Sequence, residues 1–557
     1  MKKQTKVFAT LSAAALLAVG VSAVSMAAGW DNSTGVWRYL DNNGEAVTDT
    51  WKSANGNWFY LDSDGVMATN QLIEDTNNTK TRYYYVDQYG AMVTNTWKAV
   101  AMDDSTNTDL DAEYWWYYFG ADGKAYTSED ELTTSEIKTI NGLKYAFDDE
   151  GHMLYGWIDK DNVDQQDDNQ SAWENATYYF NGWNDGHMQT GWIKLAVEDD
   201  DDTEDYWFYF DNKGKKQANK RKKINGLYYH FGEKGNMLDD WADGTSDELS
   251  GATAASLSYL NGDGAERRNK WVWAIPDEDF CSSHNMSDYD DDEYSWWYFN
   301  KSGKMTTNEI KKIGGKKYAF DEFGRMLTQF VKKDAGEDIT DLDDTDKWTR
   351  DQWIKHSRGS KYDEMFDTTD EVYFFSDNEE KDGSMKKGYQ TLNLDDGTFQ
   401  FYFNTSNGRA ENGYVSKIKK YVNMGLVLAP GADDDSNYGG VDEDHLTISF
   451  GVNALDKVMV GKSGTKVKNK KKLKDENDAY YVIGKEGKVL AYFPSSDDYD
   501  DAFEVKYKDE NNNEKTKKVT IDSDMMGAES AEQFRTLVDA ARKEINSSAS
   551  GAKWTIK

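Results

Sequence analysis

Side chains that could carry out covalent chemistry are few in this sequence and lie far apart. The 557 residues contain one cysteine, Cys281, and six histidines: His152, His187, His230, His284, His356 and His445. No HExxH or Cys-x-x-Cys pattern occurs, so the spacings typical of zinc and dithiol sites are absent. Asp and Glu number 101, so acidic pairs arise from composition alone and indicate no glycosidase pair. The sequence therefore predicts a protein that is not an enzyme.

Aromatic side chains, in contrast, are abundant and clustered. There are 20 Trp, 35 Tyr and 23 Phe, and the stretch WKSANGNWFYLDSDGVMATN (51–70) places two Trp, one Phe and one Tyr within its first ten residues. Each such ring buries about 150–250 Å² when packed. A chain that is only 38% hydrophobic and has a single cysteine needs this apolar surface, because no intrachain disulfide can stabilise it.

The aromatic run recurs along the chain, each time before a turn rich in Asp, Asn and Gly. Fourteen copies lie between Trp37 and Gly487, among them WFYLDSDG, WFYFDNKG and WWYFNKSG. A longer period overlies the short one, because Gly123, Gly214 and Gly303 close equivalent turns 91 and 89 residues apart. Such self-similarity is typical of one repeat array rather than of several independent domains.

Each copy predicts a β-hairpin. Four dipeptides that favour a two-residue type I′ turn lie between short β-forming runs: Asn55-Gly56, Asn141-Gly142, Asn225-Gly226 and Gly314-Gly315. Alternation along the strand places Trp58 and Tyr60 on one face, and Phe59 and Leu61 on the other. Both faces are aromatic and must be covered, which a stack of hairpins achieves and a single hairpin cannot. The predicted fold is an all-β, repetitive β-hairpin solenoid with a short C-terminal α-helix.

The predicted organisation has four parts. Residues 1–28 predict a secretory signal peptide, because Lys2, Lys3 and Lys6 precede an apolar stretch of small residues. Residues 29–410 form the repeat array with acidic loop insertions. Residues 411–525 hold diverged repeats with a lysine-rich loop, which carries seven lysines between 462 and 474. Residues 526–557 contain a C-terminal tail and an amphipathic helix, SAEQFRTLVDAARKEI.

The net charge and the hydropathy of the chain exclude two kinds of binding partner, nucleic acid and the membrane interior. The net charge of −36 repels nucleic acid and other bare polyanions, so no nucleic acid partner is expected. No run of about 18 apolar residues follows the predicted signal peptide, so the chain is not expected to span a membrane. Acidic insertions such as VEDDDDTEDYW (197–207) are expected to be solvated hairpin tips, with weak calcium binding as the alternative because carboxylate oxygens suit that ion. No residue is assigned as a metal ligand, and no cofactor is expected.

The repeat resembles the choline-binding, or cell-wall-binding, repeat of Gram-positive surface proteins and wall-lytic enzymes. The segments WKSANGNWFYLDSDGVMATN (51–70) and YYFNGWNDGHMQTGWIK (178–194) follow its pattern, and the resemblance covers about 37–330 well and 370–495 loosely. It implies a β-solenoid of stacked hairpins, related to the glucan-binding repeats of glucosyltransferases. It also implies sites between consecutive hairpins, where two Trp and a Tyr, often with a Met, surround a choline headgroup through cation–π attraction.

The resemblance gives two groups of candidate cage residues in this chain. The first group consists of Trp51, Trp58, Met67 and Tyr83. The second consists of Trp157, Tyr178, Met188 and Trp192, with Trp207 and Tyr209 behind Trp192. Trp97 follows its turn in the same way and is a further candidate. Hairpins of the LKYAF type, which lack the Trp of the pattern, are expected only to stack.

These observations predict a secreted, non-catalytic protein of the cell wall or extracellular surface. Its expected partner is cell-wall polymer, either choline-substituted teichoic acid or wall glycan, and host surface molecules are a further class of partner. The expected role is that of an adhesin or surface scaffold, with choline as ligand. The alternative is a protein that binds neutral alpha-glucan, because sugars stack on the same Trp faces. A wall hydrolase of the amidase type is a more distant alternative.

Overall fold

The computed structural model describes residues 28–76, 80–102, 112–129, 131–163, 172–199, 202–284, 286, 293–342, 347–357, 369–376, 382–431, 434–450 and 455–553. The predicted signal peptide, except for Ala28, and parts of the acidic insertions lie outside these residues. The chain forms two compact units: residues 1–248 with 260–266, and residues 249–259 with 267–557. The domain boundaries predicted at residues 410 and 525 stay predictions.

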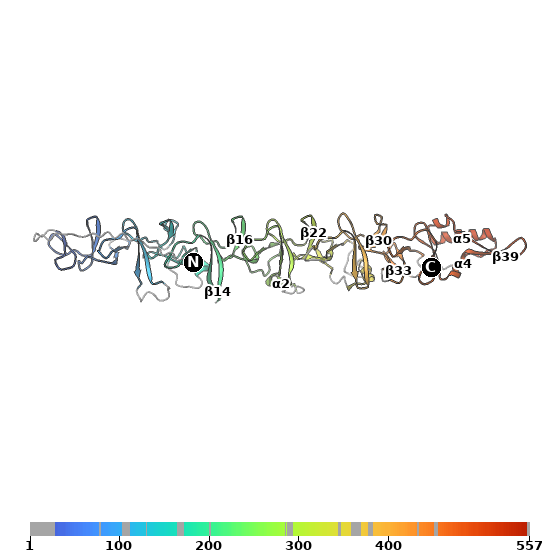
Figure 1. Ribbon diagram of the computed structural model, residues 1–557, viewed down its shortest axis with the longest axis horizontal. Coiled ribbons are helices and arrows are strands. Elements are labelled where there is room, and N and C mark those ends of the chain that lie inside the picture. Colours follow the sequence, from blue (N-terminus) through green and yellow to red (C-terminus); the bar gives the residue numbers. More distant parts are fainter. Residues whose placement is uncertain are drawn as a thin grey trace, which may run out of the picture. The chain divides into compact units, whose positions relative to one another are not determined.

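The first unit is a series of two-stranded antiparallel hairpins, as predicted (Figure 1). They are β1 (Gly29–Asp31) with β2 (Arg38–Leu40), β3 (Thr50–Ala54) with β4 (Asn57–Leu61), β5 (Gln71–Asp75) with β6 (Arg82–Val86), β7 (Thr96–Ala101) with β8 (Tyr114–Phe119), β9 (Lys138–Ile140) with β10 (Leu143–Tyr145), β11 (Gly156–Ile158) with β12 (Tyr178–Phe180), β13 (Gly191–Asp199) with β14 (Asp202–Phe210), and β15 (Lys220–Ile224) with β16 (Leu227–Phe231). The unit also holds β17 (Asp240–Asp243) and a short helix, α1 (Ala172–Asn175), in the insertion between β11 and β12.

The predicted two-residue turns are confirmed. Asn55 and Gly56 have φ values of 50° and 83° between the paired residues Ala54 and Asn57. Positive φ at both central positions is what a type I′ turn requires, and its twist matches that of the strands. The same signs recur in the other three turns, at 141–142, 225–226 and 314–315.

An aspartate stabilises the second turn of several repeats, the one that follows the aromatic strand. Oδ1 of Asp62 accepts the backbone N–H groups of Asp64 at 3.0 Å and Val66 at 2.8 Å. Gly65 between them has a φ of 69°. Short polar side chains that bind the backbone a few residues on stabilise such turns, and glycine supplies the left-handed conformation.

One kind of contact, which we name the stacking joint, connects each hairpin with its two neighbours. After the second turn, the N–H of Met67 donates to the carbonyl of Trp37 in the preceding hairpin at 2.8 Å. The Met67 side chain lies on Gly90 of the following hairpin, where an added Cβ would be 2.8 Å from Cε. Met188 lies on Gly214 in the same way. The joint needs the glycine, because any side chain there would overlap the methionine.

The second unit continues with hairpins and adds larger sheets. It contains η1 (Ala254–Ser256), β18 (Leu257–Leu260, the last residue belonging to the first unit), β19 (Lys270–Ala274) with β20 (Ser295–Phe299), α2 (Glu278–Ser283), the sheet β21 (Glu309–Ile313), β22 (Lys316–Phe320) and β23 (Met326–Leu327), the sheet β25 (Ile339–Asp341), β24 (Gln329–Lys333) and β26 (Glu371–Phe375), and α3 (Arg350–His356). A five-stranded sheet follows in the order β27 (Gly388–Leu394), β28 (Gly397–Phe403), β31 (Leu426–Val427), β30 (Lys420–Asn423) and β29 (Gly413–Val415).

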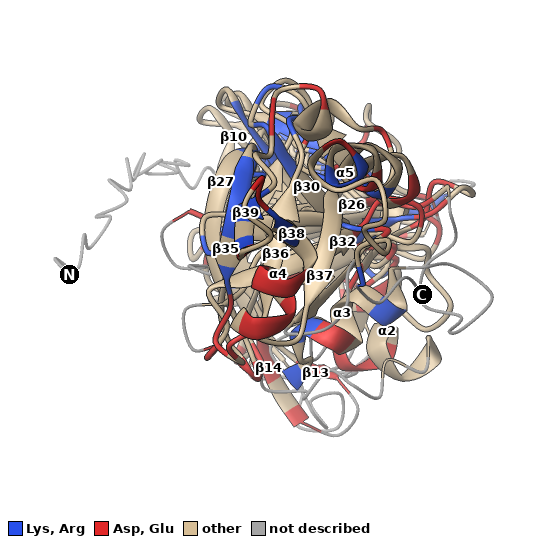
Figure 2. Ribbon diagram, turned by 90° about the vertical axis from the view of Figure 1, so that its right-hand side faces the viewer, with Lys and Arg blue, Asp and Glu red and all other residues tan. Residues whose placement is uncertain are grey.

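The C-terminal part of this unit is more compact. It contains the sheet β33 (Thr447–Phe450), β32 (Tyr438–Asp442) and β34 (Val458–Gly461), the sheet β35 (Lys470–Lys474), β36 (Tyr480–Ile483) and β37 (Val489–Phe493), α4 (Ser496–Phe503), the hairpin β38 (Glu504–Lys508) and β39 (Glu514–Lys518), η3 (Met525–Gly527) and α5 (Ala531–Ile545). Figure 2 shows lysines on β35 and β39 and acidic residues on α4. The lysine-rich stretch thus ends in a strand, β35, rather than being a loop throughout.

The predicted amphipathic helix is confirmed as α5. The hydroxyl of Ser530 caps its N-terminus by accepting the N–H of Gln533. Phe534 and Val538 are fully buried on one side of the helix, against the apolar residues of β37 and β38. Among the described residues, no helix is long and apolar enough to cross a membrane.

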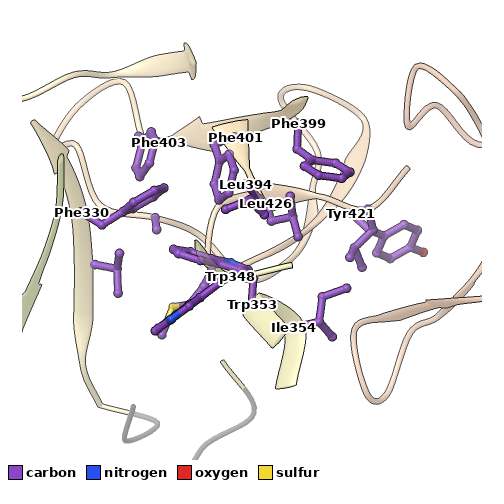
Figure 3. Packing of buried hydrophobic residues seen from close by; sticks show 14 of the residues in the cluster. Phe330, Trp348, Trp353, Ile354, Leu394, Phe399, Phe401, Phe403, Tyr421 and Leu426 are labelled. Atoms are coloured by element: carbon purple, nitrogen blue, oxygen red, sulfur yellow. The ribbon is translucent and has the colours of Figure 1, made fainter. Parts of the chain in front are cut away.

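The largest apolar cluster lies in the second unit around Trp353 (Figure 3). A capping box formed by Thr349 and Gln352 starts α3, which carries Trp353. The ring of Trp353 is fully buried between Phe330 of β24, at 4.6 Å between ring centroids, and Phe401 of β28, at 5.1 Å. An insertion between two strands therefore fills the space between neighbouring hairpins with its own side chain.

Candidate functional site: aromatic gaps between hairpins

The clearest candidate site lies between hairpin β13–β14 and hairpin β15–β16. Trp192 pairs with Tyr209 across the hairpin, and their ring centroids are 5.1 Å apart. Trp207, two residues before Tyr209, lies on the same face, 6.3 Å from Trp192. Tyr229 of the next hairpin approaches Trp192 to 4.8 Å at an angle of 66°. We name such a space a gap, after the Trp of its first strand.

The same arrangement recurs in four further gaps. In each, the centroid of the first-strand Trp is 5.1–5.5 Å from a Tyr of its own hairpin and 4.8–5.3 Å from a ring of the next. The rings are Trp30 with Tyr39 and Phe59, Trp51 with Tyr60 and Tyr84, Trp97 with Tyr118 and Tyr145, and Trp271 with Tyr298 and Tyr318. Trp37, Trp58, Trp116 and Trp296 take the place of Trp207.

Strand alternation explains this geometry. Residues that pair directly across a hairpin lie on one face, as does the ring two residues along, which we name the rim ring. The rim rings reach solvent, since Trp207 is 43% and Trp58 is 47% exposed. The Trp and Tyr behind them are more enclosed. Each gap is therefore an aromatic enclosure that opens at its rim.

A methionine of the stacking joint completes the gaps. Met92 packs with Trp51, Tyr60 and Tyr84, and Met153 packs with Trp97. Met326 packs in the same way in the Trp271 gap. Thioether sulfur is polarizable and packs well against rings. The walls of a gap are thus almost wholly apolar and polarizable.

Two tyrosines of the gaps, Tyr145 and Tyr229, have raised pKa values. Burial raises the pKa of Tyr145 and Tyr229 above the ordinary value, and a nearby carboxylate, Asp185 or Asp263 respectively, raises it further. A neutral ring presents its negative π face, which attracts cations. The same carboxylates favour a positive ligand. The arrangement can therefore hold a cation that needs no hydrogen bonds.

The first predicted group is only partly brought together. Trp51 and Trp58 lie on one face of hairpin β3–β4. The tyrosine on Trp51 is Tyr84, because Tyr83 points to the opposite face of its strand. Met67 belongs to the Trp30 gap, since its N–H binds Trp37, and Met92 takes its place beside Trp51.

The second predicted group is divided between two gaps and one buried cluster. Trp192, Trp207 and Tyr209 lie together as described. Trp157 packs on Tyr179 at 4.8 Å and not on Tyr178. Tyr178 and Met188 are buried together on the other face of β12. The predicted Trp97 heads a complete gap of its own.

Several ring residues were not predicted as site residues: Trp30, Trp37, Tyr84, Trp116, Tyr145, Tyr229, Trp271, Trp296 and Tyr318. The signal that finds them is register. In the hairpins with an Asn-Gly or Gly-Gly turn, the third residue after the turn is the ring that faces the Trp of the preceding hairpin: Phe59, Tyr145, Tyr229 and Tyr318.

One further space between hairpins is filled by ionic side chains instead of aromatic rings. Next to hairpin β15–β16, Arg221 occupies the position of the Trp, pairs with His230 and stacks on Tyr228 at 3.8 Å. Its Nη2 donates to Oε1 of the buried Glu266 at 2.9 Å, and Nε2 of His230 lies 3.0 Å from Oε2. Burial alone would raise the pKa of Glu266, but the hydrogen bonds and charges of His230 and Arg221 outweigh it and lower the pKa to about 2.

No metal-binding geometry is found in the part of the chain that the structure describes. No group of three or more His, Cys, Asp or Glu is placed there to hold a metal ion. Cys281 is buried in α2, and Nδ1 of His284 lies 2.9 Å from the carbonyl of Phe280. Parts of the acidic insertions named as weak calcium sites, including 103–111 and 287–292, lie outside the described residues.

Fold and gaps together define a repeat protein of stacked aromatic β-hairpins. Residues 47–97, which include the Trp51 gap, match the family model of the choline-binding repeat. This segment of the chain therefore carries the choline-binding repeat. No curated protein matches this sequence.

Similar solved structures come from Streptococcus pneumoniae. The modular autolysin LytC, solved in complex with a synthetic peptidoglycan ligand, is 22% identical over 55% of this chain and 54% of its own, with a TM-score of 0.30. CbpJ is 19% identical over 54% of this chain and 95% of its own, with a TM-score of 0.33. Choline binding protein F is 16% identical over 70% and 99%, with a TM-score of 0.25. The match thus spans about half the length of LytC.

Proposed function

We propose that this chain is a non-catalytic cell-wall-binding protein that holds the choline groups of a wall polymer in its aromatic gaps. The observation that carries the proposal is the recurrence of one enclosure, with nearly equal ring distances, around Trp30, Trp51, Trp97, Trp192 and Trp271. A quaternary ammonium has no hydrogen-bond donors, and such rings attract it by up to about 2 kcal/mol or more when it is desolvated. The choline-binding repeat at 47–97 supports the same ligand.

Repetition supports binding to a polymer rather than to free choline. One gap binds weakly, but several gaps on one chain engage several substituents of one polymer, and their effective concentration raises the overall affinity. The net charge of −36 disfavours a bare anionic polymer and tolerates a cationic substituent. The proposed place of action is the outer surface of the cell, after secretion, and the proposed role is that of an adhesin or surface scaffold.

The test is retention of the purified protein on three materials: choline-decorated walls, unmodified walls and dextran. We expect binding to the decorated walls only, with elution by free choline. Binding to all three, or binding that choline does not reverse, contradicts the proposal. A zymogram with the same walls checks the non-catalytic part, which a zone of clearing would overturn.

Neutral glycan binding is a second candidate, favoured by one feature of hairpin β19–β20. The rings of Trp273 and Tyr294 are nearly parallel, at 18° and 5.9 Å, and the two residues are 41% and 53% exposed. Exposed aromatic faces of this kind can stack on sugar rings. Retention on dextran that is lost in Trp273→Ala would support this candidate.

A further inference from the structure

The Trp157 gap differs from the five gaps described above at two positions. Thr177 stands where those gaps have the rim ring, and Lys216 stands at the side-chain position of the stacking joint. Lys216 stands where Met237 stands one hairpin later: both bridge to a strand-end Phe, and both donate their N–H at 2.8 Å to the preceding hairpin, to Thr177 and Trp207 respectively. The stem of Lys216 lies on Gly235, where an added Cβ would be 2.9 Å from Cδ. Lys216 therefore retains the backbone and glycine contacts of the stacking joint, but it places an ammonium group where methionine has a thioether.

The Lys216 ammonium lies in the aromatic part of this gap. Nζ is 5.5 Å from the centroid of the Trp157 ring, which in turn packs on Tyr179 at 4.8 Å and Phe208 at 5.0 Å. These two ring distances match those of the Trp192 gap. At the rim, Thr177 replaces the Trp, and the buried ring of Trp173 lies 5.8 Å from Phe208. The chain's own cation lies against its Trp.

Helix α1 holds the ammonium in place. Lys216 Nζ donates to the carbonyl of Trp173 and, at 3.1 Å, to that of Glu174. The Trp173 ring is buried, and its Nε1 donates to the carbonyl of Glu198 at 2.9 Å. Lys234 binds the carboxylate of Glu174 at 2.8 Å. The insertion between β11 and β12 is thus anchored on both sides of the lysine.

The environment restricts the gap to one cation. Burial lowers the pKa of Lys216 to about 8, while Glu174 and Asp159 act in the opposite direction, so the amine is mostly charged at neutral pH. A second cation a few ångströms away would meet like-charge repulsion in a partly desolvated site.

We propose that Lys216 closes the Trp157 gap to quaternary ammonium ligands by supplying the cation itself, and that the residue at this position of the stacking joint selects which gaps take ligand. A lysine at this position places its ammonium on the Trp of the gap. The lysine beside the Trp192 gap, Lys222, lies instead on the Tyr209 ring, at 5.2 Å. The inference rests on the proposed function, because it concerns the same ligand class in a neighbouring gap.

The first test counts choline molecules bound per chain, by isothermal titration calorimetry and equilibrium dialysis, in two reciprocal variants. Lys216→Met should add one site to the wild-type number, and Met237→Lys should remove one by filling the Trp192 gap. An unchanged number in either variant overturns the inference. Far-UV circular dichroism and thermal unfolding confirm that both variants remain folded.

The second test needs no ligand and separates the inference from the proposed function. In protein labelled with ¹³C-lysine, the ε-methylene protons of Lys216 should resonate upfield through the ring current of Trp157. Trp157→Leu should abolish that shift, whereas Trp192→Leu should leave it unchanged. Absence of the shift in the wild type overturns the inference, while a wild type that shows the shift and binds no choline contradicts the proposed function alone.

Discussion

Trp192 and Tyr229 lie with their ring centroids 4.8 Å apart although they belong to different hairpins, one to β13 and the other to β16. A gap is therefore not a property of any single repeat. It exists only where two neighbouring hairpins are folded and stacked. Ligand binding and stacking must consequently stabilise each other.

The first prediction follows from this coupling. Choline should raise the unfolding temperature of the protein, because it binds the stacked form and not the unfolded chain. At a choline concentration of 100 times the Kd, each occupied gap adds about 2.7 kcal/mol. Differential scanning calorimetry over a choline series measures the shift, with equimolar NaCl as the control for ionic strength. No shift beyond that of NaCl would contradict the coupling.

The second prediction concerns a rim ring. Trp207→Ala should weaken choline binding at the Trp192 gap by about 1 kcal/mol, or about fivefold, because one cation–π partner is lost. It should change stability little, since the residue is 43% exposed. Tyr89→Ala, at 47% exposure and in the turn after β6, outside the five gaps, is the matched control. Calorimetry gives the choline affinity of both variants. Equal losses of affinity would show that the rim ring makes no specific contribution to choline binding.

The third prediction tests the stacking joint. Gly214→Ala would place Cβ 2.2 Å from Sδ of Met188 at a φ of +82°. Gly142→Ala has a similar φ of +85° but no atom within 4 Å. Both variants should lose about 1–2 kcal/mol to backbone strain, and Gly214→Ala should lose about 1–3 kcal/mol more through overlap. Urea unfolding measures the free energy of unfolding of both variants. Equal losses of stability would mean that the Met188 side chain moves aside without an energetic cost.

The fourth prediction concerns the buried Glu266. Its folded pKa of about 2 lies below the ordinary value of about 4.5, so its ionised form stabilises the fold above pH 4.5, and this contribution falls as the pH drops toward 2. Glu266→Gln should destabilise the protein by about 3 kcal/mol at neutral pH, because Arg221 and His230 lose a buried partner. The difference from wild type should narrow between pH 4.5 and 2 in urea unfolding. A difference independent of pH would contradict the role of the charge.

Local chemistry explains which parts of the fold could be predicted from the sequence. Asn55-Gly56 determines its own turn, and the spacing of Phe534 and Val538 determines a helix face, so both were predicted correctly. The hairpin repeat followed from the recurrence of such local signals. These local signals do not determine which loop packs on which hairpin.

The grouping of site residues depended on that missing information. The resemblance groups Met67 with Trp51, whereas its N–H bond to Trp37 places it one gap earlier. Tyr83 and Tyr84 are neighbours in an all-tyrosine run, and only the pairing of Tyr84 with Ile73 shows which of them faces Trp51. Lys216 within a basic stretch gave no sign that its ammonium would lie on Trp157.

The stacking joint separates growth of the array from the choice of ligand. Its two halves, a backbone bond backward and a side chain on a glycine forward, accept Met at 188, Lys at 216 and Ala at 125. A duplicated hairpin would bring both halves with it and fit between any two neighbours that keep the glycine. Duplication can therefore lengthen the array without a new interface, and single substitutions at the joint can then change the chemistry of each new gap independently.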